Sequence, residues 1–220
     1  MPYRWNWNDM LYTLKDNITE TWLDYPLDGM AAVICFLEGC NHKCKGCQSP
    51  HTWNADPSHG HESEEVKVWI EDYAKRCGTT RVVLSGGDPF CSDMLEVLSL
   101  IHNLTKDGYD VCVYTGYDID FIEWMYGADL NYGMSLMRPR FVCTGCYRED
   151  MREETWGKTR DGFRLVSRNQ RVFEFRKRKY GLDGKFVQVS DDNYLDYHTY
   201  EGDKGHGQIL CNGNVDSLFD

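Results

Sequence analysis

The chain has 220 residues, of which 41% are apolar and 27% are charged, a composition that is ordinary for a globular domain with one hydrophobic core. Its formal net charge of −11 argues against general binding of nucleic acid through a basic surface. No apolar run approaches the roughly 18 residues of a membrane span, and the N-terminus lacks a signal peptide's features, so we expect a cytoplasmic protein that binds neither nucleic acid nor a membrane.

The first informative stretch is a short apolar run followed by cysteines. Residues 1–29 are aromatic and polar, and we expect them to form an irregular or partly helical cover. Residues 31–39, AAVICFLEG, predict a buried strand. Cys40, Cys44 and Cys47 follow directly in a C-x3-C-x2-C spacing. Loops at the carboxyl ends of parallel strands commonly form ligand sites, so this loop is the first candidate site.

Strand and helix patterns then alternate to about residue 145. This alternation predicts right-handed βαβ units and a mainly parallel sheet. In the second helix, the side chains predicted to face inward are Met94, Leu95, Val97, Leu98 and Ile101. The predicted elements are a helix from Ser63 that stops at Gly78, a strand in TTRVVLSG, a helix over 92–107, a strand over 110–114, a helix over 119–129 and a strand over 140–144.

Each predicted strand is followed by a loop with polar or glycine-rich chemistry. The second strand leads into SGGDP at 85–89, the third into Thr-Gly-Tyr at 115–117, and the fourth into Gly145 and Tyr147. Because the carboxyl ends of parallel strands meet at one edge of a sheet, these loops and the cysteine loop are expected to converge there. Four such loops at one edge indicate a site more strongly than any one of them.

Three cysteines at this spacing indicate a soft metal centre. Structural zinc sites and ordinary iron–sulfur clusters take four protein ligands, so three thiolates leave one metal position for a small molecule. The alternative is a closed zinc site completed by His42, by His51, or by Cys143 and Cys146. The spacing alone leaves both interpretations open. The scattered cysteines at 35, 77, 91, 112 and 211 are expected to be small buried or idle thiols.

After about residue 157 the alternation of strand and helix patterns ends. FRLVSRNQRVFEF at 163–175 predicts a hairpin around the SRNQR turn, and GKFVQV predicts a further strand. We therefore divide the chain into a cover segment at 1–29, a core at 30–157, a hairpin and basic segment at 158–190, and an acidic, irregular or mobile tail at 191–220.

Five segments together resemble one family. CNHKCKGCQSPHTW, LSGGDPF, VYTGYD, VCTGCY and SRNQR follow one another in this order within roughly residues 28–175. They resemble the anaerobic ribonucleotide reductase activating proteins of the radical S-adenosylmethionine (SAM) superfamily. The fold that this resemblance implies is α/β, an incomplete open (β/α) barrel with a mainly parallel sheet, a C-terminal hairpin and an irregular tail. Four to six strands cannot close an eight-stranded barrel.

The resemblance also implies two cofactors. Cys40, Cys44 and Cys47 would ligate three irons of a [4Fe–4S] cluster, and SAM would bind the fourth iron through its amine and carboxylate. Glycines let the backbone approach a ligand closely, and a carboxylate suits a cationic amine. The residues implied to line SAM are Gly86, Gly87 and Asp88 at its methionine end, and Thr115, Gly116 and Tyr117 near its ribose or adenine.

The implied activity is reductive cleavage of SAM to a 5′-deoxyadenosyl radical, which abstracts hydrogen from a glycine of the large subunit of an anaerobic ribonucleotide reductase. The cofactors would be the only catalytic groups. An external electron donor, such as a flavodoxin-like protein, would supply the electron. The open side of the fold would admit the large partner, and the candidate docking residues are Asn169, Gln170, Arg171, Arg176 and Lys177.

Two alternatives remain. One is another small radical SAM enzyme, either a different glycyl-radical activase or a deazapurine synthase-like enzyme. The other is a zinc-stabilised interaction module without catalysis. The sequence also departs from the wider superfamily at Gly46, where many members carry an aromatic residue. Cys143 and Cys146 form a C-x2-C pair that is too small for a second cluster, and their role is left open.

Overall fold

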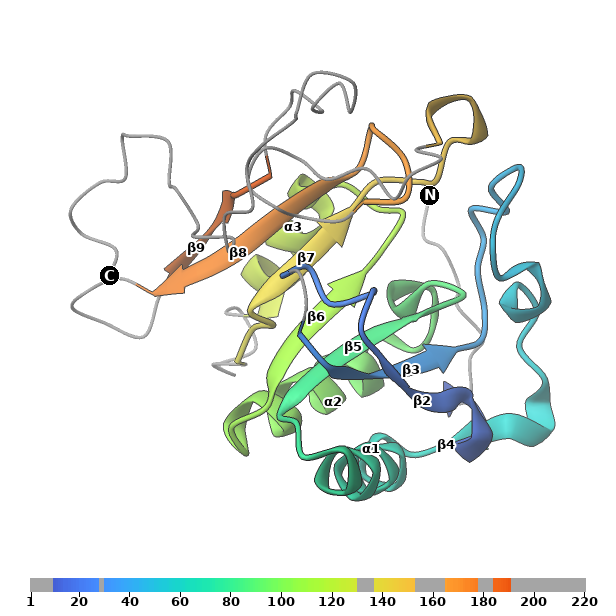
Figure 1. Ribbon diagram of the computed structural model, residues 1–220, viewed down its shortest axis with the longest axis vertical. Helices are drawn as coiled ribbons and strands as arrows, with labels where there is room; N and C mark the ends of the chain where they lie inside the picture. Colours follow the sequence, from blue (N-terminus) through green and yellow to red (C-terminus); the bar gives the residue numbers. More distant parts are fainter. Residues whose placement is uncertain (1–9, 28–29, 130–136, 153–164, 178–183, 191–220) are drawn as a thin grey trace.

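The fold is built on one open seven-stranded sheet (Figure 1). The computed structural model describes residues 10–27, 30–129, 137–152, 165–177 and 184–190. Strand order in the sheet is β2-β3-β5-β6-β7-β8-β9. The strands are β2 (Ile18–Thr21), β3 (Ala32–Leu37), β5 (Arg81–Gly86), β6 (Asp110–Tyr114), β7 (Phe141–Thr144), β8 (Arg171–Lys177) and β9 (Gly184–Gln188).

The centre of the sheet is parallel and its two sides are antiparallel. The ladders β3–β5, β5–β6 and β6–β7 are parallel, whereas β2–β3, β7–β8 and β8–β9 are antiparallel. Within the described chain, β2 and β9 are the end strands of this sheet and do not pair with each other. The predicted mainly parallel α/β core is therefore present, while the sheet is not closed and a barrel is not confirmed.

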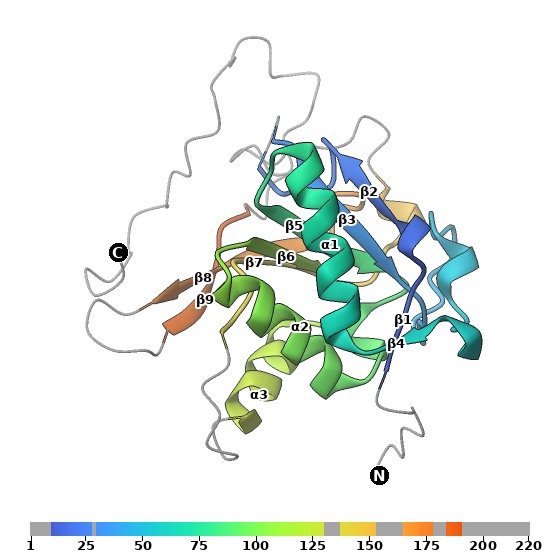
Figure 2. The ribbon, with the colours of Figure 1, turned by 90° about the horizontal axis from the view of Figure 1, so that it is seen from below.

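Three helices connect the parallel strands and lie on one face of the sheet (Figure 2). They are α1 (Ser63–Cys77), α2 (Met94–Lys106) and α3 (Ile119–Asp129). Alternate residues of β3 serve the two faces: Val33 and Leu37 pack in the core on the helix side, and Ile34 packs in the core on the other side. None of the helices in the described ranges is long and apolar enough to cross a membrane.

The helix boundaries follow local signals in the sequence. α1 begins at Ser63 as predicted and ends at Gly78, whose left-handed backbone (φ +65°) closes the last turn. α2 begins after Asp93, whose side chain accepts hydrogen bonds from two amides of the first turn. One inward assignment is wrong: Leu95 is 67% exposed. At about 100° per residue, Leu95 lies across the helix from the buried Val97.

The expectation of an irregular N-terminal cover is wrong for part of residues 1–29. β2 forms an edge strand of the main sheet, and β1 (Leu11–Tyr12) pairs with β4 (Gly60–His61) in a separate two-stranded sheet. In β2 the two middle residues are exposed and only Ile18 and Thr21 are buried. Such a short edge strand gives almost no hydrophobic pattern from which to predict it.

The hairpin predicted around the SRNQR turn is not found among the described residues. Within the described residues, 165–170 form a turn with an isolated bridge between Ser167 and Arg152, and a hairpin is formed by β8 and β9 instead. Both strands extend the core sheet through β7. The acidic tail at 191–220 and the segments 158–164 and 178–183 lie outside the described residues.

Candidate metal centre and cofactor cavity

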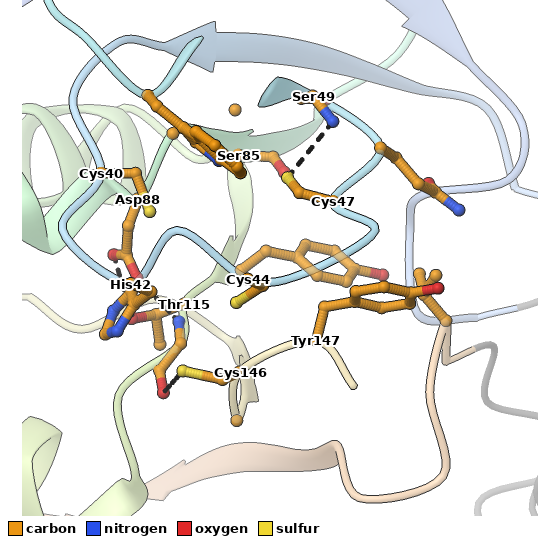
Figure 3. Close-up of a pocket in the computed structure, with 18 of the residues that line it drawn as sticks. Cys40, His42, Cys44, Cys47, Ser49, Ser85, Asp88, Thr115, Cys146 and Tyr147 are labelled. Atoms are coloured by element: carbon orange, nitrogen blue, oxygen red, sulfur yellow. Dashed lines mark hydrogen bonds and ion pairs between the residues drawn. The ribbon is translucent and has the colours of Figure 1, made fainter. Parts of the chain in front are cut away.

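One cavity lies at the carboxyl ends of the parallel strands (Figure 3). The four predicted loops all contribute to its wall. Tyr117 is the one predicted SAM-lining residue that is not part of the wall. The lining residues from these segments include Cys40, His42, Cys44, Cys47 and Trp53 after β3, Ser85 and Gly86 at the end of β5, Gly87 and Asp88 after β5, Thr115 and Gly116 after β6, and Gly145, Cys146 and Tyr147 after β7.

Gly86 and Gly87 let two of these loops pack backbone to backbone. A Cβ on Gly86, which has φ +105°, would overlap the carbonyl of Leu37, and a Cβ on Gly87 would overlap the carbonyl of Gly39. The Gly87 amide donates to the Leu37 carbonyl at 2.7 Å, and the Asp88 amide donates to the Gly39 carbonyl at 2.8 Å. The two glycines therefore fix the start of the cysteine loop as well as lining the cavity.

The cysteine loop is tied down by the segment that returns from it. Gly39 N donates to Thr52 O at 2.8 Å, and Cys40 N donates to Trp53 O at 2.9 Å. The Thr52 hydroxyl donates to Ser49 O at 2.8 Å and is buried with the rest of its side chain. Through these bonds Thr52 and Trp53 hold the cysteine loop in place, whether or not they also contact a ligand.

The loop after β7 packs against the cysteine loop through Gly46. This residue has φ +74°, and a Cβ placed on it would lie 2.8 Å from Oε1 of Glu149. The neighbouring Lys45 pairs with Glu149 at 3.0 Å. An aromatic side chain at position 46 would have to move the exposed end of Glu149 and adopt a left-handed backbone conformation that favours glycine.

Asp88 connects three loops through its buried carboxylate, which is 2% exposed. It accepts hydrogen bonds from the Thr115 hydroxyl at 3.0 Å, the Gly116 amide at 2.7 Å and the Phe90 amide at 2.9 Å. His42 Nε2 lies 2.9 Å from Asp88 Oδ2, an ion-pair contact without the angles of a hydrogen bond. Any contact between this carboxylate and a ligand amine would share it with these protein donors.

His42, within the cysteine loop, packs against Tyr117 of the loop after β6. Their rings meet edge to face at 4.7 Å, and Asn41 Nδ2 donates to the Tyr117 hydroxyl at 3.3 Å. The contact with Asp88 raises the pKa of His42. A Cβ on Gly116 would lie 2.6 Å from the His42 ring, so the glycine makes room for the imidazole.

The residues proposed to complete a zinc site are not assembled around the three cysteines. His51 is exposed and does not line the cavity, and His42 faces Asp88. Cys143 is fully buried, with its Sγ 3.9 Å from Cys112 Sγ, whereas Cys146 lines the cavity. The C-x2-C pair therefore does not present two thiols to one metal.

The cavity thiols differ in their electrostatics. Contact with the Cys91 thiol, helped by backbone amides, lowers the pKa of Cys40 to about 6. Burial raises the pKa of Cys44, and burial together with Cys44 raises the pKa of Cys146 to about 11. Three thiols from one loop in one cavity fit a cluster held by three cysteines, because thiolates are the ligands that iron–sulfur clusters use.

Trp53 offers a second observation that fits a bound polar group. It lines the cavity, and its indole Nε1 is buried with no hydrogen-bond partner among the described residues. Buried donors are normally satisfied, so an orphan donor in a cavity wall is suited to an acceptor on a ligand.

The predicted docking residues are mostly internal supports. Asn169 Nδ2 donates to Cys146 O at 2.8 Å, and Gln170 Nε2 donates to Gly145 O at 3.3 Å. The Gln170 side-chain oxygen accepts from the amides of Val166 and Ser167. Sequence patterns gave no sign that this turn holds the loop after β7.

Two of the basic docking candidates make contacts within the protein, and the third is exposed. Arg171 donates to two backbone carbonyls of its own turn, and Arg176 pairs with Glu174 at 3.1 Å. Lys177 is exposed. A docking role for these residues stays a prediction.

Comparison with known proteins gives consistent matches. A family model described as a 4Fe-4S single cluster domain matches residues 28–173. Several relatives carry the name anaerobic ribonucleoside-triphosphate reductase-activating protein. That of Vibrio cholerae is 29% identical over 54% of this chain and 81% of its own length, and that of Salmonella typhi is 32% identical over 49% and 72%. That of Enterobacteria phage T4 is 29% identical over 45% and 67%.

Among solved structures, QueE from Escherichia coli aligns with a TM-score of 0.39 and 23% identity, over 48% of this chain and 53% of the QueE chain. This likeness is too low to bear on function.

Proposed function

Because the chain belongs to the family of anaerobic ribonucleoside-triphosphate reductase-activating proteins and contains a 4Fe-4S single cluster domain, we propose that it is a radical SAM activase. It would generate a glycyl radical on the large subunit of an anaerobic ribonucleotide reductase. The observation that carries this proposal is the meeting of Cys40, Cys44 and Cys47 with the loops after β5, β6 and β7 in one cavity.

In this proposal the three cysteines hold the cluster and leave one iron for SAM. The chemistry that the two cofactors supply is one-electron reduction of the SAM sulfonium and cleavage of a C–S bond. The protein would hold the two cofactors in position relative to each other. Backbone groups of Gly86 and Gly87 line the wall beside the cysteine loop, and the indole of Trp53 offers an unpartnered N–H.

Asp88 acts in this proposal mainly as a positioning residue. Its carboxylate holds the Thr115 hydroxyl and the Gly116 amide, so the loop after β6 keeps a fixed place beside the loop after β5. Thr115 and Gly116 are then available to line the nucleoside end of SAM, as the family resemblance implies. Tyr117 packs against His42 and does not line the cavity, so its contact with SAM stays a prediction.

The test begins with anaerobic reconstitution of the protein with iron and sulfide. Reduction with dithionite in the presence of SAM should give 5′-deoxyadenosine and methionine, and Cys44→Ala should lose both the cluster spectrum and the products. Cys77→Ala is the matched control, because Cys77 ends α1 and does not line the cavity. Retained SAM cleavage in Cys44→Ala would contradict the ligand assignment.

The partner is tested separately with the cognate anaerobic reductase subunit. The expected result is a glycyl doublet in the EPR spectrum of the reductase after incubation with the reduced activase and SAM. SAM cleavage without this doublet would favour a different radical SAM enzyme, and a protein purified without air that contains zinc but neither iron nor sulfide would favour the interaction module. A flavodoxin-like donor, the absence of nucleic-acid binding and a cytoplasmic location stay predictions.

A further inference from the structure

A row of aromatic rings leads from the cysteine loop to the surface of α3. The ring centroids of His42, in the cysteine loop, and Tyr117 lie 4.7 Å apart. Tyr117 stacks on Phe121 at 4.2 Å, and the ring of Phe121 lies 5.9 Å from that of Trp124, both within the range of aromatic contacts. Trp124 is 61% exposed. These four residues, the aromatic row, therefore connect a residue between two candidate ligands with solvent.

The inner end of the aromatic row is also bonded next to the first candidate ligand. Asn41 Nδ2 donates to the Tyr117 hydroxyl at 3.3 Å, and Asn41 directly follows Cys40 in the chain. Tyr117, Phe121 and Trp124 do not line the cavity. The row thus approaches the cysteine loop separately from the space in which a small molecule would bind.

The outer end of the aromatic row lies among acidic residues. Asp118, Asp120 and Glu123 are exposed, and Asp120 lies four residues before Trp124, so the two are neighbours on the surface of α3. These three acids and Trp124 make up what we call the α3 face. A single exposed apolar residue is common on protein surfaces, so it is the connection through the row that distinguishes this face. Tryptophan is enriched at the centres of interfaces, and an acidic surround favours a basic partner.

We propose that the α3 face is the docking site of the one-electron donor and that the aromatic row is the path from this donor to the cluster. This inference rests on the proposed function, which needs an electron from outside the protein. One electron leaves the reduced group of the donor and enters the oxidised cluster, and no bond forms or breaks. Electron tunnelling weakens steeply across gaps, so rings in contact favour transfer without being oxidised or reduced themselves. The partner that fits is a carrier protein with basic residues around its redox group.

The test uses two haem proteins of opposite charge as probes, the basic cytochrome c and the acidic cytochrome b5. Each ferric probe takes one electron from the cluster after reduction with dithionite and anaerobic removal of the excess, and one path serves both directions of transfer. Stopped-flow spectroscopy of the haem gives a limiting rate and a half-saturating concentration. For cytochrome c, this concentration should rise with salt. Trp124→Ala should raise it by about tenfold, as loss of a tryptophan at an interface centre does, and Trp124→Phe by less.

The edge strand β2 offers matched control variants. Trp22, just after β2, is 57% exposed, and Glu20 within β2 is exposed as well. Glu123→Gln should weaken saturation by cytochrome c, whereas Glu20→Gln, with the same change in net charge, and Trp22→Ala should not. Phe121→Leu, inside the row, should lower the limiting rate and leave the half-saturating concentration unchanged. SAM cleavage driven by dithionite should be normal in all these variants.

The outcomes separate this inference from the proposed function. If SAM is cleaved but Trp124→Ala and Glu123→Gln behave like their β2 controls, the docking site is refuted and the proposed function stands. An unchanged limiting rate in Phe121→Leu would overturn the path, and tighter saturation by cytochrome b5 than by cytochrome c would overturn the basic partner. A wild type that forms no cluster would overturn the proposed function and this inference together.

Discussion

The amide nitrogen of Asp88 donates a hydrogen bond of 2.8 Å to the carbonyl oxygen of Gly39. This bond joins the loop after β5 to the residue that immediately precedes Cys40, the first candidate ligand. The two loops can approach this closely because Gly87 has no side chain to separate them. The geometry of the cysteine loop therefore depends on a residue that is far from it in the sequence.

Gly87→Ala should disturb this contact. The new Cβ would overlap the Gly39 carbonyl, so we expect a loss of about 1–3 kcal/mol in the free energy of unfolding and a lower iron content after reconstitution. Urea denaturation of the apoprotein and iron analysis measure the two effects. Gly127→Ala in α3 is the control, because a Cβ there meets nothing within 4 Å and should leave both values unchanged or raise stability by up to about 1 kcal/mol. Equal behaviour of the two variants would contradict the assignment.

Asp88→Asn should destabilise the protein even without cofactors. The amide group of the new side chain would face the Gly116 amide or the Thr115 hydroxyl, leaving buried donors without an acceptor at a cost of about 1–3 kcal/mol. Thr115→Val removes only one of these donors and should cost less. Urea titrations of the two apoproteins provide the comparison, and a stability of Asp88→Asn equal to wild type would show that the carboxylate is not a structural link.

Substitutions at Gln170 and Lys177 distinguish residues that support the fold from residues that contact the partner. Gln170→Ala leaves the Gly145 carbonyl and two amides of its own turn without their partner, so we expect a loss of about 1–3 kcal/mol. Lys177 is exposed, and Lys177→Ala should change stability by no more than about 0.5 kcal/mol. If Lys177 contributes to docking, its variant lowers the yield of glycyl radical on the reductase while SAM cleavage stays normal. A stable Gln170→Ala variant would indicate that the turn is not a support.

The stability of the apoprotein should depend on acid through Asp107. Its carboxylate lies 2.8 Å from Nζ of Lys67, and this contact lowers the pKa of Asp107. A carboxyl group whose pKa is lowered by folding stabilises the folded state above its unfolded pKa, and this stabilisation is lost as the pH falls through the folded pKa. The free energy of unfolding of the wild type should therefore fall more steeply below about pH 4 than that of Asp107→Asn. Parallel slopes in urea titrations across this range would contradict the prediction.

The sequence predicted the parallel core well because that core repeats a strong local pattern. β6 has the predicted boundaries, and α1 begins at the predicted Ser63. The edge strand β2 was missed because its two buried residues are separated by two exposed ones. The pairing of β8 with β9 was also missed: a strand was predicted in GKFVQV, but β8 was predicted to pair with the segment before the SRNQR turn, and residues 165–170 form a turn instead.

At the site, spacing predicted which loops meet but not how they are held together. The three cysteines, Gly86 and Gly87 line the cavity as expected. Asp88 also lines the cavity; its hydrogen bonds from Thr115 and Gly116 were not predicted, and its contact with a ligand stays a prediction. Cys91 is buried as predicted, and its thiol donates to Asn41 Oδ1 at 3.0 Å, a contact that the sequence did not predict. Side-chain contacts between distant loops depend on how the whole sheet edge packs, and a local sequence pattern does not predict them.

The carboxylate of Asp88 touches the cysteine loop through His42 and the loop after β6 through Thr115 and Gly116. Under the proposed function, these two loops hold the cluster and the nucleoside part of SAM. Ordering either loop then favours the ordered state of the other, so the two binding events are thermodynamically linked. By reciprocity, the factor by which the cluster tightens SAM binding equals the factor by which SAM tightens retention of the cluster. The protein would thus lose its cluster most readily when SAM is scarce.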